Sequence, residues 1–226
     1  NKITVEKKPE RIISLAPSHT EILFSLGLGD KVIGVTSFCD YPEEAKNKED
    51  IGSFTKINLE KIIELEPDLI IQYGPGEEEN NTRLKEAGIN ILSYEPETMD
   101  EVIELIRTIG KITDTVDKAE TIIKDIICRK EKIIEKVKDA EKIKVFYEIW
   151  YAPLIAAGAG SFMDELMTLA GGDNIAKDVA GEYSQFDVEQ LIERDPEVYL
   201  TAEDMEEKTV ESIKSRPGYE NISAIK

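Results

Sequence analysis

One pattern of apolar and polar positions occurs twice along the chain. Residues 58–71 read NLEKIIELEPDLII, and the same pattern starts again 129 residues later, at residues 187–200, as DVEQLIERDPEVYL. In each copy, a polar residue that can cap a helix precedes apolar positions at helical spacing. A proline then ends the helix, and the apolar run after it is typical of a buried parallel strand. Each copy therefore predicts a short helix that leads into a strand.

A second pattern is also repeated, and in the same order. Residues 18–21 (SHTE) and 161–164 (SFMD) have the spacing of a capping box at a helix start, with Ser18 and Ser161 as the capping residues. Two different patterns that recur in one order indicate an internal duplication. The sequence therefore predicts two similar α/β lobes.

The remaining segments fit the same fold class. Strands are predicted at residues 11–15, 31–35, 89–93 and 143–149, and helices at residues 18–28, 78–87 and 99–112. Residues 72–76 (QYGPG) form a predicted turn at the carboxyl end of a strand. In an open parallel sheet this edge is where ligands bind.

A long amphipathic segment without glycine or proline lies between the two halves. Its apolar positions recur at helical spacing, which predicts one helix of roughly 36 Å at about 1.5 Å per residue. We expect this helix to connect the lobes as a rigid spine; the alternative, a coiled-coil partner helix, has a stripe of only about three heptads to support it. The chain then divides into an N-terminal α/β lobe (1–114), a connecting helix (115–139) and a C-terminal α/β lobe (140–226).

The composition excludes several classes of protein. A net charge of −19 argues against nucleic acid or an anionic membrane as a partner. Cys39 and Cys128 have neither zinc nor redox spacing, and we expect no disulfide between them because they fall in different elements. No apolar run is long enough to span a membrane. One histidine and no phosphate-binding glycine loop argue against an enzyme or a metallocluster subunit.

Aromatic side chains fall in loops at the ends of predicted strands, and they are Tyr41, Phe54, Tyr73, Trp150, Tyr151 and Tyr183. Aromatic faces bury a large area at low entropic cost and suit a flat ligand, although ordinary core packing is the alternative for each. His19 alone cannot form a metal site with several protein ligands. It either contacts a ligand or stays neutral in a first helical turn, so we predict neither a metal site nor a catalytic residue.

Four segments together resemble a known family. They are SLAPSHTEILFSLGLGDKVIGV (14–35), CDYPEEA (39–45), GSFTKINLEKIIELEPDLII (52–71) and FDVEQLIERDPEVYL (186–200). They are similar to the cobalamin-binding proteins of ATP-driven vitamin importers, within the wider group of periplasmic binding proteins that also carries siderophores and haem. The resemblance covers essentially the whole chain.

The resemblance implies two Rossmann-like lobes joined by one long rigid helix, with the ligand in the cleft between them. It implies an extracytoplasmic, monomeric binding protein, periplasmic or lipid-anchored, that is not an enzyme and has no cofactor besides its ligand. The implied ligand is a corrinoid (cobalamin or cobinamide), delivered to the permease dimer of an ABC importer. A siderophore or haem binder is the alternative, but the arginines are scattered rather than clustered. Family members continue for about one strand and one helix beyond the position of Lys226.

The resemblance also assigns roles to individual residues. Tyr41, in the CDYP segment, matches a tyrosine that contacts the corrin, and Phe54, Tyr73 and Tyr183 match positions often held by tryptophan. Trp150 and Tyr151 lie where the first strand of the second lobe leaves its sheet.

Two glutamates are candidates for contact with the permease. Glu60 and Glu189 occupy the same place in the first helical turn of the duplicated motif. A favourable interaction with the helix dipole would explain a carboxylate there without any partner. Duplication, however, places the two on equivalent surfaces of two lobes, which suits a two-fold symmetric partner. By resemblance, these are the glutamates that meet arginines on the membrane permease.

Overall fold

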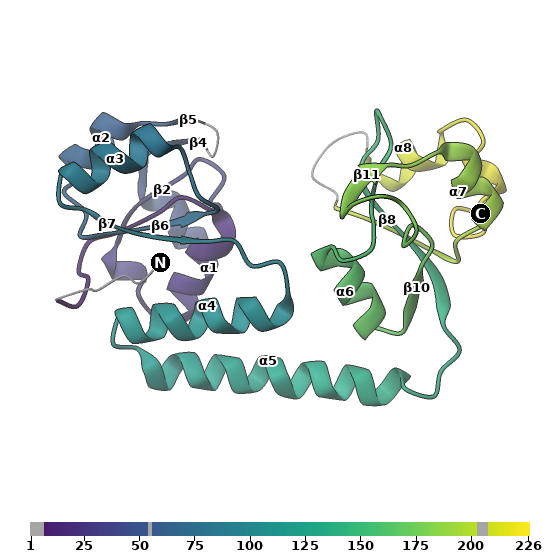
Figure 1. Ribbon diagram of the computed structural model, residues 1–226, viewed down its shortest axis with the longest axis horizontal. Coiled ribbons are helices and arrows are strands. Elements are labelled where there is room, and N and C mark those ends of the chain that lie inside the picture. Colours follow the sequence, from purple (N-terminus) through teal and green to yellow (C-terminus); the bar gives the residue numbers. More distant parts are fainter. Residues whose placement is uncertain (1–6, 54–55, 203–207) are drawn as a thin grey trace. The chain divides into compact units, whose positions relative to one another are not determined.

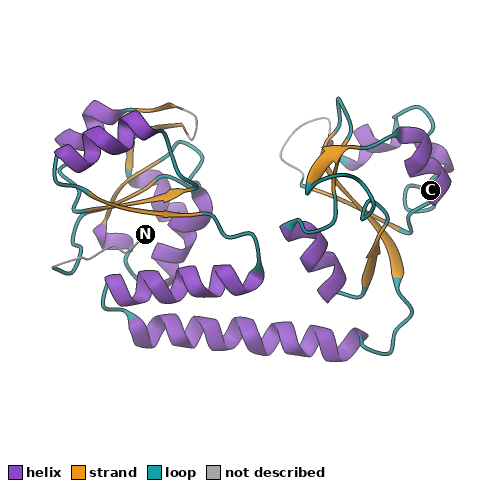
Figure 2. Ribbon diagram, in the orientation of Figure 1, coloured by secondary structure: helices purple, strands orange, loops and turns teal. Residues whose placement is uncertain are grey.

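The computed structural model describes residues 7–53, 56–202 and 208–226. The chain forms two compact units: the first contains Asn1–Pro96 and Asp100–Lys124, and the second contains Glu97–Met99 and Asp125–Lys226. Each unit has its own β-sheet with helices packed around it (Figures 1 and 2). The predicted α/β fold class is therefore confirmed.

The first unit is built on a five-stranded parallel sheet in the order β3-β2-β1-β6-β7. Its strands are β1 (Ile12–Ser14), β2 (Val32–Val35), β3 (Glu49–Asp50), β6 (Leu69–Tyr73) and β7 (Asn90–Tyr94), and β4 (Gly52–Ser53) pairs with β5 (Lys56–Ile57) in a separate ribbon. Its helices are α1 (Pro17–Ser25), α2 (Leu59–Glu64), α3 (Glu78–Glu86) and α4 (Met99–Ile112), with 3-10 turns at Gly29–Lys31 and Glu43–Asn47.

Helices cover both faces of this sheet. Ile13 and Ile70, on the neighbouring strands β1 and β6, pack with Ile62 of α2 and Leu84 of α3. Successive side chains of a strand point to opposite faces, so Ile12 belongs to the other face, where Figure 1 shows α1 and α4. All five side chains are fully buried. The two strands are therefore buried on both faces, as their continuous apolar sequence predicts.

The second unit has a mixed sheet around β8 (Ile143–Trp150). Strand β8 pairs in parallel with β10 (Gly172–Asn174) and β12 (Val198–Thr201), and it forms an antiparallel pair with β9 (Ile155–Ala157), which in turn pairs with β11 (Tyr183–Gln185). Its helices are α6 (Phe162–Leu169), α7 (Val188–Arg194) and α8 (Val210–Lys214), with a 3-10 turn at Tyr219–Asn221. The antiparallel strands β9 and β11 were not predicted from the sequence.

The predicted long helix is present as α5 (Val116–Val137), which has 22 residues. The boundary between the two units falls inside it, between Lys124 and Asp125. Cys128 is exposed on this helix, whereas Cys39 is buried in the first unit, and both thiols are free. No disulfide joins these two cysteines, as expected from their different elements.

Both copies of the duplicated motif fold in the same way. The side chains of Asn58 and Asp187 accept hydrogen bonds from backbone N–H groups in the first turns of α2 and α7, so both residues are N-caps. After each helix, the residue before the proline has a left-handed backbone, with φ of 47° at Glu66 and 46° at Asp195. The chain then enters a strand parallel to the first strand of its unit.

In each unit, a pair of residues bonds the first strand to the end of the helix and to the strand that follows the proline. In the first unit, the backbone N–H of Arg11 donates to the Asp68 carboxylate (3.1 Å), that of Asp68 donates to the Arg11 carbonyl (2.9 Å), and the Arg11 guanidinium bonds carbonyls just after α2. In the second unit, Lys144 and Glu197 repeat the backbone bonds at 3.1 and 2.9 Å, and the Lys144 ammonium bonds a carbonyl at the end of α7 (3.0 Å). We call the pairs Arg11–Asp68 and Lys144–Glu197 the strand clasps.

One predicted helix cap is wrong. Helix α1 begins at Pro17 with Ala16 as its N-cap, and no side chain caps it, so Ser18 is an exposed residue of the first turn. Proline favours the first helical position because its φ is preset and it has no N–H to satisfy there. Ser161, the equivalent residue in the second unit, caps α6 as predicted by accepting a hydrogen bond from the N–H of Asp164 (3.1 Å).

The strand that ends the second copy is also less buried than predicted. Strand β12 is parallel, as expected, but Leu200 is 39% exposed, and Val198 and Tyr199 are only half-buried. Among the strands of the described residues, β12 pairs with β8 alone. It therefore lacks the second neighbour that covers β6 in the first unit.

A buried ion pair ties β8 to the segment after α8. Glu148 is fully buried and Arg216 is 4% exposed. The guanidinium forks across the carboxylate, with Nη2 bonded to Oε1 at 3.2 Å and Nη1 bonded to Oε2, while the Tyr199 hydroxyl also donates to Oε2. Burial acts to lower the pKa of Arg216, but the hydrogen bond and charge of Glu148 outweigh it and raise that pKa. The guanidinium carbon lies 3.7 Å from the ring centroid of Tyr151.

We expect Arg216→Met to destabilise the second unit strongly, because it leaves the Glu148 carboxylate buried without its partner. The loss should be about 3–5 kcal/mol, measured as the free energy of unfolding in urea. The double variant Glu148→Met, Arg216→Met should recover most of this loss, because it removes both charges. A single variant that loses less than about 1 kcal/mol would show that the pair is not an essential contact.

Candidate functional site

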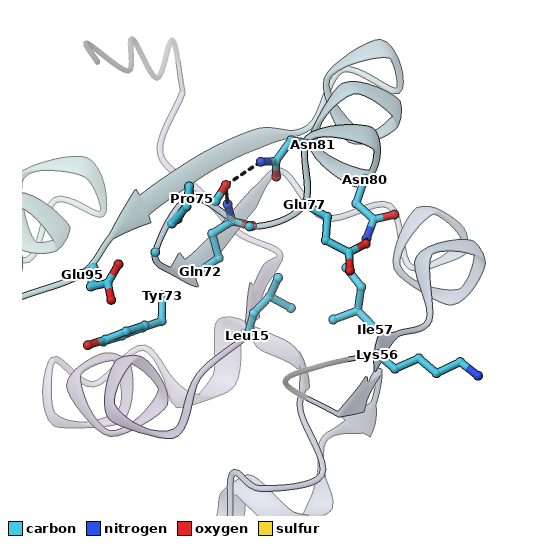
Figure 3. Close-up of a pocket in the computed structure, with 12 residues that line it drawn as sticks. Leu15, Lys56, Ile57, Gln72, Tyr73, Pro75, Glu77, Asn80, Asn81 and Glu95 are labelled. Carbon is cyan, nitrogen blue, oxygen red and sulfur yellow. Dashed lines mark hydrogen bonds between the residues drawn. The ribbon is translucent and has the colours of Figure 1, made fainter. Parts of the chain in front are cut away.

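A pocket of about 610 Å³ opens at the carboxyl edge of the sheet in the first unit. Its lining follows the ends of three neighbouring strands, because Leu15 comes after β1, Tyr73 ends β6 and Glu95 comes after β7. Figure 3 shows these side chains, with Lys56 and Ile57 of β5 on another side of the pocket. Ligands of open parallel sheets bind at this edge. The sequence placed the turn at residues 72–76 at the same edge.

Hydrogen bonds fix the shape of that turn. The side-chain amide of Gln72 donates to the carbonyl of Pro75 (2.9 Å) and to the hydroxyl of Ser93 (2.8 Å), and the amide of Asn81 donates to the same carbonyl (2.7 Å; Figure 3). Gly76 has a φ of 66°, which favours glycine, and a Cβ there would lie 2.6 Å from the Gln72 amide. The rim of the pocket is therefore pre-formed.

The lining combines apolar surface with amides and carboxylates. Its apolar side chains are Leu15, Ile57, Tyr73 and Pro75, and its polar side chains are Gln72, Asn80, Asn81, Glu77, Glu95 and Lys56. The lining contains two carboxylates and one amine, so its net charge is negative. The pocket suits a ligand with a flat apolar face and hydrogen-bond donors at its edge, rather than a ligand with several negative charges.

The structure places the predicted aromatics of the first unit in different positions. Tyr73 lines the pocket at the strand edge. Tyr41 is 66% exposed and lines a second hollow of about 660 Å³, together with Phe24 and Pro42. Phe54 lies outside the described residues. Tyr41 and Tyr73 therefore both offer a ring to a ligand, but in separate hollows of this unit.

The three aromatics of the second unit differ in exposure. Trp150, at the end of β8, is 41% exposed, and its indole N–H donates to the carbonyl of Ala152 (3.0 Å). Tyr183, on β11, is 50% exposed. Tyr151 is half-buried between Arg216 and Tyr219, with its ring at right angles to that of Tyr219. Trp150 and Tyr183 thus have free ring surface, whereas Tyr151 packs in the core.

His19 lies behind the pocket rather than in its lining. It is in the first turn of α1 and fully buried, with its ring centroid 5.9 Å from that of Tyr73. Both ring nitrogens are buried without a hydrogen-bond partner in the described part of the chain. Burial lowers the pKa of His19 to about 4, so the imidazole is neutral at pH 7. A ligand contact by His19 stays a prediction.

The two glutamates of the duplicated motif are both exposed in first turns. The Glu60 side chain, on α2, is 79% exposed, and its carboxylate lies 3.5 Å from the guanidinium of Arg83. Glu189 is exposed on α7, next to the N-cap Asp187, which accepts a hydrogen bond from its backbone N–H (2.7 Å). Neither carboxylate is required by the packing of its unit.

Sequence reasoning missed Lys56 of the pocket and four further polar residues, namely Glu77, Asn80, Asn81 and Glu95. Glu95 had a usable signal, because it lies two residues after the predicted strand 89–93, at the edge where ligands bind. Glu77, Asn80 and Asn81 fall in a polar run, residues 77–82, that is indistinguishable from a solvated helix face. Only the fold shows that this run faces the pocket.

No group of three or more His, Cys, Asp or Glu side chains within residues 7–53, 56–202 and 208–226 is arranged to hold a metal ion. Within the same ranges, no helix is both long and apolar enough to cross a bilayer.

Two α/β units that share one long helix, with a pre-formed pocket at a sheet edge, define a solute-binding protein of the kind that serves ABC importers. The chain belongs to the periplasmic binding protein family, whose profile matches residues 12–226. The relatives that it resembles are named as binding proteins, and the family is one of extracytoplasmic binding proteins.

Two curated relatives illustrate the similarity. A vitamin B12-binding protein of Vibrio parahaemolyticus is 33% identical over 204 residues, which is 89% of this chain and 74% of the relative. An uncharacterised ABC transporter substrate-binding lipoprotein of Bacillus subtilis is 34% identical over 99% of this chain and 72% of the relative.

Solved structures of proteins named for different ligands have the same fold. The periplasmic vitamin B12-binding protein of Vibrio cholerae has a TM-score of 0.77 and 30% identity, over 96% of this chain and 84% of that one. A periplasmic haem-binding protein of Roseiflexus has a TM-score of 0.85 and 25% identity, over 96% of this chain and 86% of that one. The family is therefore established, and the substrate is not fixed by these similarities.

Because His19 is buried in its neutral form, the free energy of unfolding should depend on pH in the acid range. Its pKa is about 4 in the folded chain against 6.5 ordinarily, so between these values the unfolded chain binds a proton that the folded chain does not. Stability therefore falls as the pH drops from about 6.5 to about 4, by roughly 3 kcal/mol. Urea unfolding of wild type and His19→Phe across this range should show the extra loss in wild type only. Parallel pH curves for the two proteins would contradict it.

Proposed function

We propose that the chain captures a corrinoid, cobalamin or cobinamide, and delivers it to the permease of an ABC importer. The observation that carries this proposal is the lining of the strand-edge pocket, where the flat ring of Tyr73 stands beside side-chain amides and carboxylates (Figure 3). A corrinoid has a flat macrocycle with neutral amide groups at its edge, so it matches both parts of this lining. The vitamin B12-binding relatives support the same ligand.

The arginines supply the argument against an anionic ligand. A siderophore or haem carboxylate calls for cations in the pocket, yet among the described residues that line it Lys56 is the single cation. All six arginines bond groups of the protein itself: Arg11, Arg83, Arg107, Arg129, Arg194 and Arg216. Five of them are in carboxylate pairs, and Arg11 is in a strand clasp. The cations that would bind such a ligand are therefore committed elsewhere.

We assign the main contact in the first unit to Tyr73, and Tyr41, which lines a separate hollow, keeps the contact that the resemblance implies. From the second unit, Trp150 and Tyr183 are the candidates, because their rings are exposed. Tyr151 is a weaker candidate because its ring packs on Arg216. Phe54 keeps the role that the resemblance implies, outside the described residues.

Calorimetry should detect about one cyanocobalamin bound per chain at pH 7.5. Tyr73→Ala should weaken binding about tenfold or more, because it removes an aromatic face worth about 1.4 kcal/mol or more in contact with the ligand. Phe38→Ala is the matched control: Phe38 is a 61% exposed aromatic of the same unit that lines neither hollow.

Haem and a ferric catecholate siderophore are the competitors in the same experiment. Tighter binding of haem than of cyanocobalamin, with an absorbance change that disappears in Tyr73→Phe, would replace the corrinoid by haem, because a phenol can ligate haem iron. No heat with any of the three would remove the proposal that this pocket takes a flat macrocycle.

The proposed contact with the permease uses Glu60 and Glu189. Each is an exposed acid in a first turn, one in each unit, at equivalent positions of the duplicated motif. A permease built from two like subunits could meet each glutamate with one basic pocket. Such association is steered by charge and is weakened by salt.

The double variant Glu60→Ala, Glu189→Ala should abolish transporter binding or vitamin uptake while leaving ligand affinity intact. The loss in folding stability should be small, at most about 1 kcal/mol for each residue, from the helix dipole and one exposed ion pair. The matched control is Asp117→Ala, Glu211→Ala, which removes two exposed acids from the first turns of α5 and α8. Full uptake by the glutamate variant, or loss of ligand binding in isolation, would place the docking surface elsewhere.

A further inference from the structure

The imidazole of His19 occupies an unusual place for a polar side chain. It is fully buried, and neither ring nitrogen has a hydrogen-bond partner within the described residues. A buried polar atom without a partner is destabilising, and an apolar side chain of similar shape would avoid this cost. Core packing alone therefore gives no reason for a histidine at this position.

The neighbour of His19 connects it to the proposed ligand site. Its ring lies 5.9 Å from the ring of Tyr73, centroid to centroid, with 34° between the planes. Tyr73 is the last residue of β6 and lines the pocket at the strand edge. His19 is therefore a buried neighbour of a ring that lines the pocket, without being part of the lining itself.

We infer that His19 is a positioning residue for the ligand pocket: its neutral ring packs behind Tyr73 and holds that ring in the pocket wall. Protonation of His19 would place an unpaired charge in this buried position, which is unfavourable, so the imidazolium must move towards water. Tyr73 and the turn that follows it would then lose the surface they pack against. This inference rests on the proposed function, and it adds that ligand affinity depends on the protonation state of one residue.

Few other ionisable side chains lie near His19 in the described structure. Helix α1 packs against β1 and β6, and the only other titratable side chains on these three elements are Glu21, which is exposed, and Tyr73 itself. Cys39 bonds Thr20 on the same helix, and Glu95 lies next to Tyr73 in the pocket (Figure 3). The low pKa of His19, about 4, has burial as its cause, without a charged neighbour. Glu95 is therefore the group that a test must separate from His19.

The test begins without ligand, by nuclear magnetic resonance of the single histidine and of the tyrosine rings between pH 7.5 and 3.5. The Tyr73 signals are assigned by their absence in Tyr73→Phe. In wild type, the Tyr73 ring should shift with the same midpoint as His19, near pH 4. In His19→Phe the ring should lose this transition, and in Glu95→Gln it should keep it. A His19 midpoint near 6.5, a Tyr73 ring that does not respond, or an equal response in His19→Phe would overturn the inference.

The second arm measures the affinity for cyanocobalamin. His19→Ala leaves a void behind Tyr73 and should weaken binding at pH 7.5 about tenfold or more, and His19→Phe, which restores a ring, should recover most of that loss. In wild type, the dissociation constant should rise about twofold from pH 7 to pH 4 through protonation of His19, because half of the chains are then competent. This rise should be absent in His19→Phe. Equal affinity of the alanine variant and wild type would refute the positioning role.

The two arms keep the inference separate from the proposed function. If wild type binds no cyanocobalamin at pH 7.5, the proposed function fails, and the resonance experiment still decides whether His19 positions Tyr73. If cyanocobalamin binds and the Tyr73 ring ignores His19, the proposed function stands and the inference fails.

Discussion

The fold depends on the strand clasps at the first strand of each sheet. They bond β1 to the end of α2 and the start of β6, and β8 to the end of α7 and the start of β12. A left-handed residue before a proline turns the chain sharply from α2 into β6, and from α7 into β12. Such a backbone costs about 1 kcal/mol or more at a residue other than glycine. The strand clasps supply compensating contacts, because each bonds the carbonyls left free at the helix end and fixes the strand register in the same place. Helix direction, strand pairing and register are thus set together.

The ligand pocket follows from the same arrangement. Strand β6 is buried on both faces along its length, and it comes to the surface only at its carboxyl end, where Tyr73 leads into the turn. The apolar interior fixes where that end lies, and the bonds of Gln72 and Asn81 fix the shape of the rim. No arginine is among the described residues that line the pocket, because the arginines bond other groups of the protein. The buried strand fixes the pocket wall, and the lining lacks arginine. The pocket therefore suits a neutral, flat molecule.

The sequence predicts this architecture well where one local signal controls the result. The caps at Asn58 and Asp187 and the prolines after their helices place the duplicated elements, and the turn after β6 places Tyr73 at the ligand edge. The prediction failed at Ser18, where the proline before it competed for the start of the helix and won.

The rest of the site could not be predicted because it depends on what lies next to what in three dimensions. Asn80 and Asn81 have the sequence of any solvated helix, and their role comes from a turn that folds back on them. His19 looked like an ordinary first-turn residue, and only the fold shows that its ring lies behind Tyr73. The half-exposed β12 is a similar case, since its sequence resembles that of β6 but it pairs with a single strand of the described chain.

The strand clasps also record how the two halves of the chain have diverged since duplication. The first unit uses a short acid with a long base, Asp68 with Arg11, and the second uses a longer acid with a shorter base, Glu197 with Lys144. Both members differ between the copies, yet in each the acid accepts from the backbone N–H of the base, and the base bonds the equivalent carbonyl, that of Leu65 or Arg194. The two copies therefore share the joint reach of the pair and not the identity of either residue. A search for distant members of this lineage would do better to score the two positions together than to require either amino acid alone.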